Sequence, residues 1–125
     1  VVQADGGTRT AAVTGSSVAL ACAIHRLQAE NQVGKNILRD FLAAVSVGIV
    51  EGEPVLDLCY LEDAAAEVDM NIVMTGAGQF VEIQGTAEST PFDLRQTEQM
   101  LDLARRGIAQ LIQKQKEALG TDACP

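Results

Sequence analysis

The spacing of hydrophobic residues changes twice along the chain. From about residue 9 or 10 to residue 28, apolar side chains recur every three or four positions, which predicts a helix. From residue 41 the period becomes two, which predicts strands at 41–50, 54–61, 68–75 and 79–85. From Asp93 the helical spacing returns, and Gly120 is suited to end that second helix. Residues 1–4 are apolar enough to predict one more short strand.

Turn and cap residues separate these elements. Glycines predict hairpin turns at 51–53 and 76–78, and residues 32–40 form a connector. Asp93 and Gln96 have the spacing of a helix capping pair. The strands should bury one face each, formed by Val45, Val47 and Ile49, and by Leu56, Leu58 and Tyr60. The apolar stripe of the last helix is predicted to contain Leu94, Thr97, Leu101, Ala104, Ile108, Leu111 and Ala118.

The order of elements, β-α-β-β-β-β-α, is typical of an α+β two-layer sandwich. The chain has 125 residues, so we expect a single domain over residues 1–125 with one modest core. The chain starts without Met on an apolar stretch, and we therefore expect an N-terminal part of something larger to be absent.

The charge is unevenly distributed. The formal net charge is −8, and the segment 51–98 holds eleven acidic residues against one basic residue, Arg95. Phosphate backbones require local positive charge, so this distribution argues against nucleic-acid binding over the whole surface. It is compatible with binding of a divalent cation. The three cysteines, Cys22, Cys59 and Cys124, are far apart, which argues against a disulfide framework and predicts a reducing, cytoplasmic location. No stretch approaches the roughly 20 apolar residues of a membrane helix, so we expect a soluble chain.

The segment 4–10, Ala-Asp-Gly-Gly-Thr-Arg-Thr, joins the predicted first strand to the helix. Free N–H groups and the helix dipole make such a helix N-terminus suited to an anion, and glycine permits close approach. Arg9 adds a guanidinium, while Thr8 and Thr10 add hydroxyl groups. The alternative is a plain strand-to-helix turn in which Thr8 caps the helix.

Two aspartates flank an acidic, alanine-rich connection. Asp63 is expected to close one strand and Asp69 to open the next, which would place both carboxylates at one end of the sheet if the strands are antiparallel neighbours. Two convergent carboxylates, completed by waters and a substrate phosphate, suit Mg²⁺. The alternative is a solvated acidic turn.

Other catalytic arrangements find little support. His25 lies 16 residues beyond Arg9, roughly 24 Å along a continuous helix, and is the only histidine, which argues against a Ser-His-Asp or Cys-His mechanism. Four cations on the last helix could contact RNA or could simply complement the helix dipole, and these are Arg105, Arg106, Lys114 and Lys116.

Four segments, in this order, resemble the bacterial ribonuclease PH family. They are 3–15 (QADGGTRTAAVTG), 43–49 (AAVSVGI), 62–71 (EDAAAEVDMN) and 81–88 (VEIQGTAE). The resemblance implies a fold like the second domain of ribosomal protein S5. It also implies a phosphate-dependent 3′→5′ exoribonuclease that trims the 3′ ends of tRNA precursors, releases nucleoside diphosphates and assembles as a cytoplasmic ring of six subunits.

Carried over to this sequence, the resemblance assigns Gly7, Thr8 and Arg9 to inorganic phosphate, with Arg9 also catalytic. It assigns Asp63 and Asp69 to catalysis and to Mg²⁺. The family's enzyme is about twice as long, and this chain resembles its C-terminal half. The absent N-terminal half would supply a further arginine for phosphate and much of the basic RNA-facing surface, so the chain alone is expected to be inactive. Two alternatives stay open: a non-catalytic ring subunit of an exosome-like assembly, and a phosphate- or nucleotide-binding module.

Overall fold

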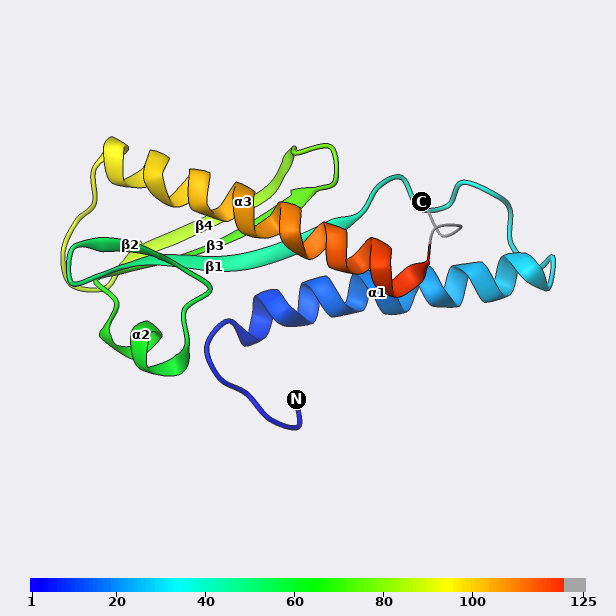
Figure 1. Cartoon of the computed structure of the whole chain (residues 1–125), viewed down its shortest axis with the longest axis horizontal. Helices are drawn as coiled ribbons and strands as arrows, with labels where there is room; N and C mark the ends of the chain where they lie inside the picture. The colour runs from blue at the N-terminus through cyan, green and yellow to red at the C-terminus, as the bar shows by residue number, and fades with distance from the viewer. Residues whose placement is uncertain (121–125) are drawn as a thin grey trace.

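The computed structural model describes residues 1–120 and shows three helices and a four-stranded sheet (Figure 1). The elements follow the order α1 (Thr8–Ala29), β1 (Leu42–Val50), β2 (Glu53–Leu56), α2 (Tyr60–Ala65), β3 (Val68–Thr75), β4 (Phe80–Ala87) and α3 (Leu94–Leu119). The α+β two-layer class expected from the sequence is therefore confirmed.

The sheet is antiparallel throughout, with the strand order β2-β1-β3-β4. The β1–β2 turn is a two-residue loop in which both Glu51 and Gly52 have positive φ, as expected for a tight hairpin. The β3–β4 turn contains Gly76 and Gly78. Both predicted hairpins are confirmed, and β1 occupies the inside of the sheet because β3 pairs with it along its length.

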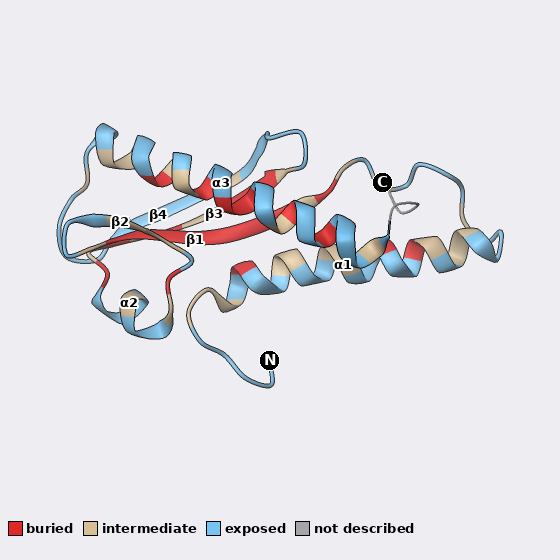
Figure 2. Ribbon diagram, in the orientation of Figure 1, coloured by how far each residue is buried: buried red, intermediate tan, exposed pale blue. Residues whose placement is uncertain are grey.

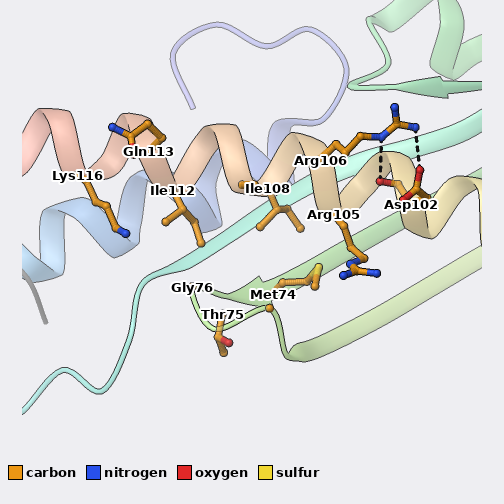
Figure 3. A pocket seen from close by; sticks show the side chains of 12 residues that line it. Met74, Thr75, Gly76, Asp102, Arg105, Arg106, Ile108, Ile112, Gln113 and Lys116 are labelled. Atoms are coloured by element: carbon orange, nitrogen blue, oxygen red, sulfur yellow. Dashed lines mark hydrogen bonds and ion pairs between the residues drawn. The ribbon is translucent and has the colours of Figure 1, made fainter.

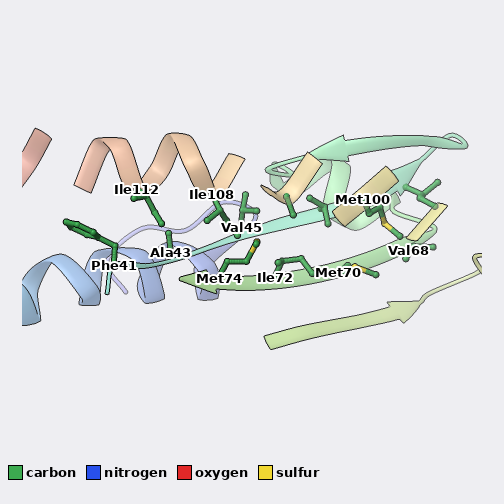
Figure 4. Packing of buried hydrophobic residues seen from close by; sticks show 13 residues of the cluster. Phe41, Ala43, Val45, Val68, Met70, Ile72, Met74, Met100, Ile108 and Ile112 are labelled. Atoms are coloured by element: carbon green, nitrogen blue, oxygen red, sulfur yellow. The ribbon is translucent and has the colours of Figure 1, made fainter. Parts of the chain in front are cut away.

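The core lies between one face of the sheet and α3 (Figure 4). Val45, Val47 and Ile49 point into it, as their alternation predicted. The stripe that α3 contributes is formed by Met100, Ala104, Ile108 and Ile112. The predicted stripe is confirmed at Ala104 and Ile108, and at Leu101 and Leu111, which are partly buried against the core, but Leu94 is 73% exposed and Ala118 is also exposed.

Both ends of α3 form as predicted. The Asp93 carboxylate accepts a hydrogen bond from the Gln96 N–H at 2.8 Å, and the Gln96 side chain accepts one from the Asp93 N–H at 2.9 Å. This reciprocal capping box satisfies N–H groups that the helix itself leaves without partners. Gly120 follows the last turn with a φ of 81°.

Helix α1 runs along the edge of β1 where β2 has ended. The Thr14 hydroxyl accepts a hydrogen bond from the Ala44 N–H at 3.0 Å and lies 3.2 Å from its carbonyl oxygen. From α3, Gln115 donates to the carbonyl oxygens of Thr14 and Leu42. These contacts satisfy the open edge of β1, so its central residues are buried while α1 keeps much of its own surface exposed (Figure 2).

The element order differs from the prediction in two places. Residues 1–4 form no strand: they pair with none of the four strands of the sheet, and Val1 and Val2 are fully exposed. The predicted strand 54–61 ends at Leu56, because Asp57 adopts a left-handed φ of 59°. A short helix, α2, follows; Leu58 is buried but Tyr60 is 65% exposed, so the predicted buried face stops at Leu58.

Cys22 and Cys59 are both free thiols, and Cys124 lies outside the described residues. Over residues 1–120, none of the helices combines the length and apolar character needed to cross a membrane.

Candidate functional site

The loop before α1 is fastened to the start of α2. One carboxylate oxygen of Asp5 accepts hydrogen bonds from the N–H groups of Gly6, at 2.9 Å, and Tyr60, at 2.6 Å. A Cβ atom at Gly6 would lie only 2.0 Å from the Leu58 carbonyl oxygen, so only glycine fits there. The loop and the segment preceding α2 therefore hold each other in place.

Helix α1 begins without a side-chain cap. Its N-cap residue, Gly7, has φ 65° and ψ 24°, a left-handed conformation that glycine adopts at little cost. The Thr8 hydroxyl donates to the Asp5 carbonyl oxygen and the Thr10 hydroxyl to the Gly7 carbonyl oxygen. Thr8 therefore does not cap the helix as the alternative proposed. The first N–H groups of the helix, which have no intrahelical acceptor, remain suited to an anion.

Arg9 extends from the first turn of α1 to the far strand of the sheet. One of its guanidinium nitrogens lies 2.6 Å and 2.8 Å from the two carboxylate oxygens of Glu82 on β4. The side chains of Arg9 and Glu82 are 56% and 36% exposed. The guanidinium is thus held by an ion pair that solvent can reach, which the sequence did not predict.

The acidic pair comes from a helix and a strand. Asp63 lies on α2, which begins with a capping box between Cys59 and Glu62, so the expectation that Asp63 closes a strand was wrong. Asp69 is the second residue of β3, opposite Gly48 of β1. The strands before and after the acidic segment, β2 and β3, are separated by β1 and are not neighbours.

Burial raises the pKa of the Asp69 carboxyl above its ordinary value of 3.8. The negative charges of Asp63 and Glu88 raise this pKa further, whereas a hydrogen bond from the Met70 N–H acts in the opposite direction. The contribution of Asp63 means that the two aspartates interact electrostatically. A bound cation would relieve this repulsion.

The loop, the helix N-terminus and the acidic pair meet around one hollow, which we call the site hollow. Its volume is about 230 Å³, and it is lined by Asp5, Gly6, Gly7, Thr8, Arg9, Ser46, Asp63, Asp69 and Asn71. The five residues that the resemblance assigned to phosphate and Mg²⁺ are therefore brought together, whereas Thr10 does not line the hollow. Ser46 and Asn71, which are register partners on β1 and β3, were missed. Asn71 could have been found, because residues two apart on a strand share a face and Asp69 precedes it by two.

The donors in the site hollow fit a hard cation that keeps part of its water shell. Within residues 1–120, no group of three or more histidine, cysteine, aspartate or glutamate side chains is arranged to hold a metal ion. Asp63 and Asp69 offer two carboxylates on one hollow. Mg²⁺ is commonly bound by one or two carboxylates together with waters and substrate phosphate oxygens, so this pair suits it.

The cations of α3 lie away from the site hollow. Arg105, Arg106 and Lys116 line a pocket of about 500 Å³ between α3 and the β3–β4 turn (Figure 3). Arg106 pairs with Asp102 at 2.9 Å and Lys116 lies over the Phe41 ring. Lys114 pairs with Glu117 at 2.8 Å.

Comparison with solved structures supports the fold. The chain superposes on the crystal structure of rice (Oryza sativa) Rrp46 with a TM-score of 0.71 and 18% identity, covering 97% of this chain and 50% of that chain. A match to an archaeal exosome core has a TM-score of 0.55 and 20% identity, over 62% of this chain and 31% of that chain. These likenesses are consistent with the fold of the second domain of ribosomal protein S5.

Sequence comparison identifies the family. The chain is 56% identical to ribonuclease PH of Solibacter usitatus (strain Ellin6076) over 119 residues, which are 95% of this chain and 50% of that protein. It thus spans about half the length of this relative and matches its C-terminal half. Residues 40–107 match the family described as "3′ exoribonuclease family, domain 2". The chain therefore belongs to the 3′ exoribonuclease family, and it is similar to the C-terminal half of ribonuclease PH.

Proposed function

We propose that this chain carries the phosphate- and metal-binding half of a phosphorolytic 3′→5′ exoribonuclease. The single observation that carries the proposal is the site hollow, where the N-terminus of α1, Arg9 and the Asp63/Asp69 pair line one small space. An anion site and a carboxylate pair side by side are the minimum equipment for metal-assisted phosphoryl transfer.

In the proposed reaction, an oxygen of inorganic phosphate attacks the phosphorus of the last phosphodiester of an RNA strand. A new P–O bond forms, the bond to the 3′ oxygen of the shortened RNA breaks, and the terminal nucleotide leaves as a nucleoside diphosphate. The N–H groups of Gly7, Thr8 and Arg9 hold the attacking phosphate, and the Arg9 guanidinium adds charge. Arg9 is free to turn toward phosphate because an exposed ion pair such as Arg9–Glu82 is worth only about 0–1 kcal/mol.

Asp63 and Asp69 would hold Mg²⁺ in this proposal. The ion would neutralise the negative charge that develops on the scissile phosphate during transfer. The two carboxylates would hold the positive charge of the ion beside the phosphate site. The pKa of Asp69 is raised by burial and by the nearby charge of Asp63, so ionisation of both carboxylates is unfavourable without a cation. A bound cation would favour the ionised forms, which supports the assignment of this pair to a metal.

RNA binding requires more than this chain. The segment 51–98 has one basic residue among eleven acidic ones, so it offers little attraction to a phosphate backbone. We therefore propose that an N-terminal half like that of the relative supplies the RNA-facing cations, that six such subunits form a cytoplasmic ring, and that tRNA 3′ ends are the substrate. The match to one half of the relative supports the first of these statements.

Two other functions compete with this proposal. A non-catalytic ring subunit of an exosome-like assembly would share the fold, but a purely structural subunit needs neither the Gly7–Arg9 segment nor the Asp63/Asp69 pair. A phosphate- or nucleotide-binding module would use the N-terminus of α1 but would not need the acidic pair.

The test uses a two-part enzyme in which the N-terminal half of the Solibacter usitatus ribonuclease PH is joined ahead of Val1. Release of nucleoside diphosphates from an oligoribonucleotide is measured with and without inorganic phosphate. Release that depends on phosphate and is abolished by Asp63→Asn supports the proposal. Phosphate binding without release would favour the binding module, and neither binding nor release would favour the non-catalytic subunit.

A further inference from the structure

A buried serine lies beneath the N-terminus of α1. Ser46 is on β1, is 4% exposed and lines the site hollow. Its hydroxyl oxygen has no hydrogen-bond partner, a condition that it shares, among the buried side chains of residues 1–120, only with the Oε1 atom of Gln115. A buried polar group without a partner lowers the stability of the folded state by about 1–3 kcal/mol, so a hydrogen-bond partner from a ligand would remove this cost.

The Ser46 hydroxyl faces the anion-binding end of the helix. A Cβ atom at Gly7 would lie 3.2 Å from the Ser46 Oγ, closer than such contacts usually are. Because Gly7 has no Cβ, the space between the N-cap residue and the hydroxyl stays open. The same hollow is lined by Arg9 and by the acidic pair.

The Ser46 hydroxyl makes no contact that the fold requires. Its backbone is already fixed, since the Ser46 carbonyl oxygen accepts a hydrogen bond from the Asp57 N–H at 2.8 Å. On the same face of β1 the neighbouring residues are Ala44 and Gly48, so packing alone would accept alanine. Gln115 differs, because its amide nitrogen donates to two carbonyl oxygens and thereby joins α3 to α1 and β1.

We propose that the Ser46 hydroxyl donates a hydrogen bond to an oxygen of inorganic phosphate held at the N-terminus of α1. Ser46 is then a further phosphate-binding residue, acting from below the helix end while the N–H groups and Arg9 act from the side of α1. The inference rests on the proposed function, because it requires that phosphate occupies the site hollow. The missing partner of the buried hydroxyl is then a ligand oxygen.

The variants Ser46→Ala and Ser46→Cys test the assignment in the two-part enzyme. Hydrogen bonds to charged groups contribute about 1.5–3 kcal/mol, so Ser46→Ala should raise the KM for phosphate at least about tenfold. The KM for RNA should stay within about twofold. Ser46→Cys should fall between wild type and alanine, because a thiol is a weak donor. Ser89→Ala, on an exposed residue outside the hollow, is the matched control and should change neither constant.

A second measurement guards against misfolding. Removal of an unpaired buried hydroxyl should leave the Tm of the 125-residue chain unchanged or higher without phosphate, and should reduce the rise in Tm on addition of inorganic phosphate. An unchanged phosphate KM in folded Ser46→Ala would overturn the inference, as would a lower Tm combined with an unchanged phosphate response. If the proposed function is wrong, the wild-type two-part enzyme itself would release no nucleoside diphosphate in response to phosphate. That outcome is distinguishable from an unchanged phosphate KM in Ser46→Ala.

Discussion

Arg9 and Glu82, 73 positions apart in the chain, form an ion pair across the face of the sheet opposite α3. Glu82 lies opposite Val73 in the β3–β4 register, on the same face as Asp69. The guanidinium that phosphate would need is therefore held by a carboxylate of the same domain. In the proposed enzyme, phosphate and Glu82 compete for Arg9.

Removal of this competitor should strengthen phosphate binding. Glu82→Gln keeps the size of the side chain but loses its charge, so the KM for phosphate should fall by up to about fivefold, the factor that corresponds to about 1 kcal/mol for an exposed pair. Steady-state rates at varied phosphate concentration measure this effect. Glu98→Gln, which removes an acidic charge from an exposed position on α3, is the control, and an equal fall in both variants would point to a general charge effect.

Removal of Arg9 should have the opposite effect. Arg9→Ala leaves the helix N-terminus intact but deletes the charged donor, so the KM for phosphate should rise at least about tenfold. The Tm should change little, because the side chain is 56% exposed and contributes little to the core. An unchanged phosphate KM would contradict the assignment of Arg9 to phosphate.

The pH dependence of stability should identify the acidic pair. The pKa of Asp69 is raised in the folded state by burial and by the charges of Asp63 and Glu88. The folded chain therefore holds this proton more tightly than the unfolded chain, and this carboxyl lowers stability as the pH rises from 3.8 through its raised pKa. Asp69→Asn should accordingly raise the Tm by a few degrees at pH 7 but not at a pH well below 3.8, where Asp69 is protonated in both states.

The same variant separates stability from function. Mg²⁺ should raise the Tm of the wild-type chain by relieving the repulsion, and should raise that of Asp69→Asn less. In the two-part enzyme Asp69→Asn should lose most of the turnover with little loss of RNA binding, because the metal acts mainly in the transition state. A lower Tm with activity retained would instead identify an acidic turn with a structural role.

The surroundings of Gly6 and Gly15 predict opposite effects of substitution by alanine on the stability of the chain. Gly6→Ala places a Cβ atom 2.0 Å from a backbone oxygen of the adjacent segment, and should destabilise the chain by about 3 kcal/mol or more. Gly15→Ala, in the middle of α1, adds a carbon that meets no atom within 4 Å beyond its own stretch of helix, and should stabilise the chain by up to about 1 kcal/mol. Thermal unfolding of both variants measures the difference, and equal effects would contradict the packing of the loop against Leu58.

The sequence predicted correctly those turns and caps that depend on residues close together in the chain. The hairpin at Gly52 and the caps of α3 depend on neighbours within a few positions, and they form as expected. Helix α2 was not predictable in this way, because its N-cap is a cysteine, a residue that rarely signals a helix start. The prediction of a strand at residues 1–4 failed for a different reason: apolar residues alone do not make a strand, and these residues pair with none of the four strands.

The site could be predicted in composition but not in arrangement. Each motif was visible alone, yet their meeting depends on β1 lying between β2 and β3, which no local pattern shows. Ser46 had a weak signal, a single hydroxyl in an otherwise apolar run, whose meaning depends on Gly7 lying above it. No sequence signal indicated the Arg9–Glu82 pair, because the two residues are 73 positions apart.

The outer strand of the sheet should govern the behaviour of the isolated chain. Among residues 1–120, β4 pairs with β3 alone and its other edge is open. Phe80, Val81 and Ile83 on this strand are 44%, 60% and 50% exposed. An open edge with apolar side chains favours pairing with another chain. The 125-residue chain should therefore self-associate. Its formal net charge of −8 opposes binding to a phosphate backbone, so it should not degrade RNA unaided. Ile83→Lys should reduce the self-association seen by light scattering, whereas Leu94→Lys, at an exposed position at the start of α3, should reduce it less. A monodisperse wild-type monomer that phosphorolyses RNA by itself would contradict both expectations.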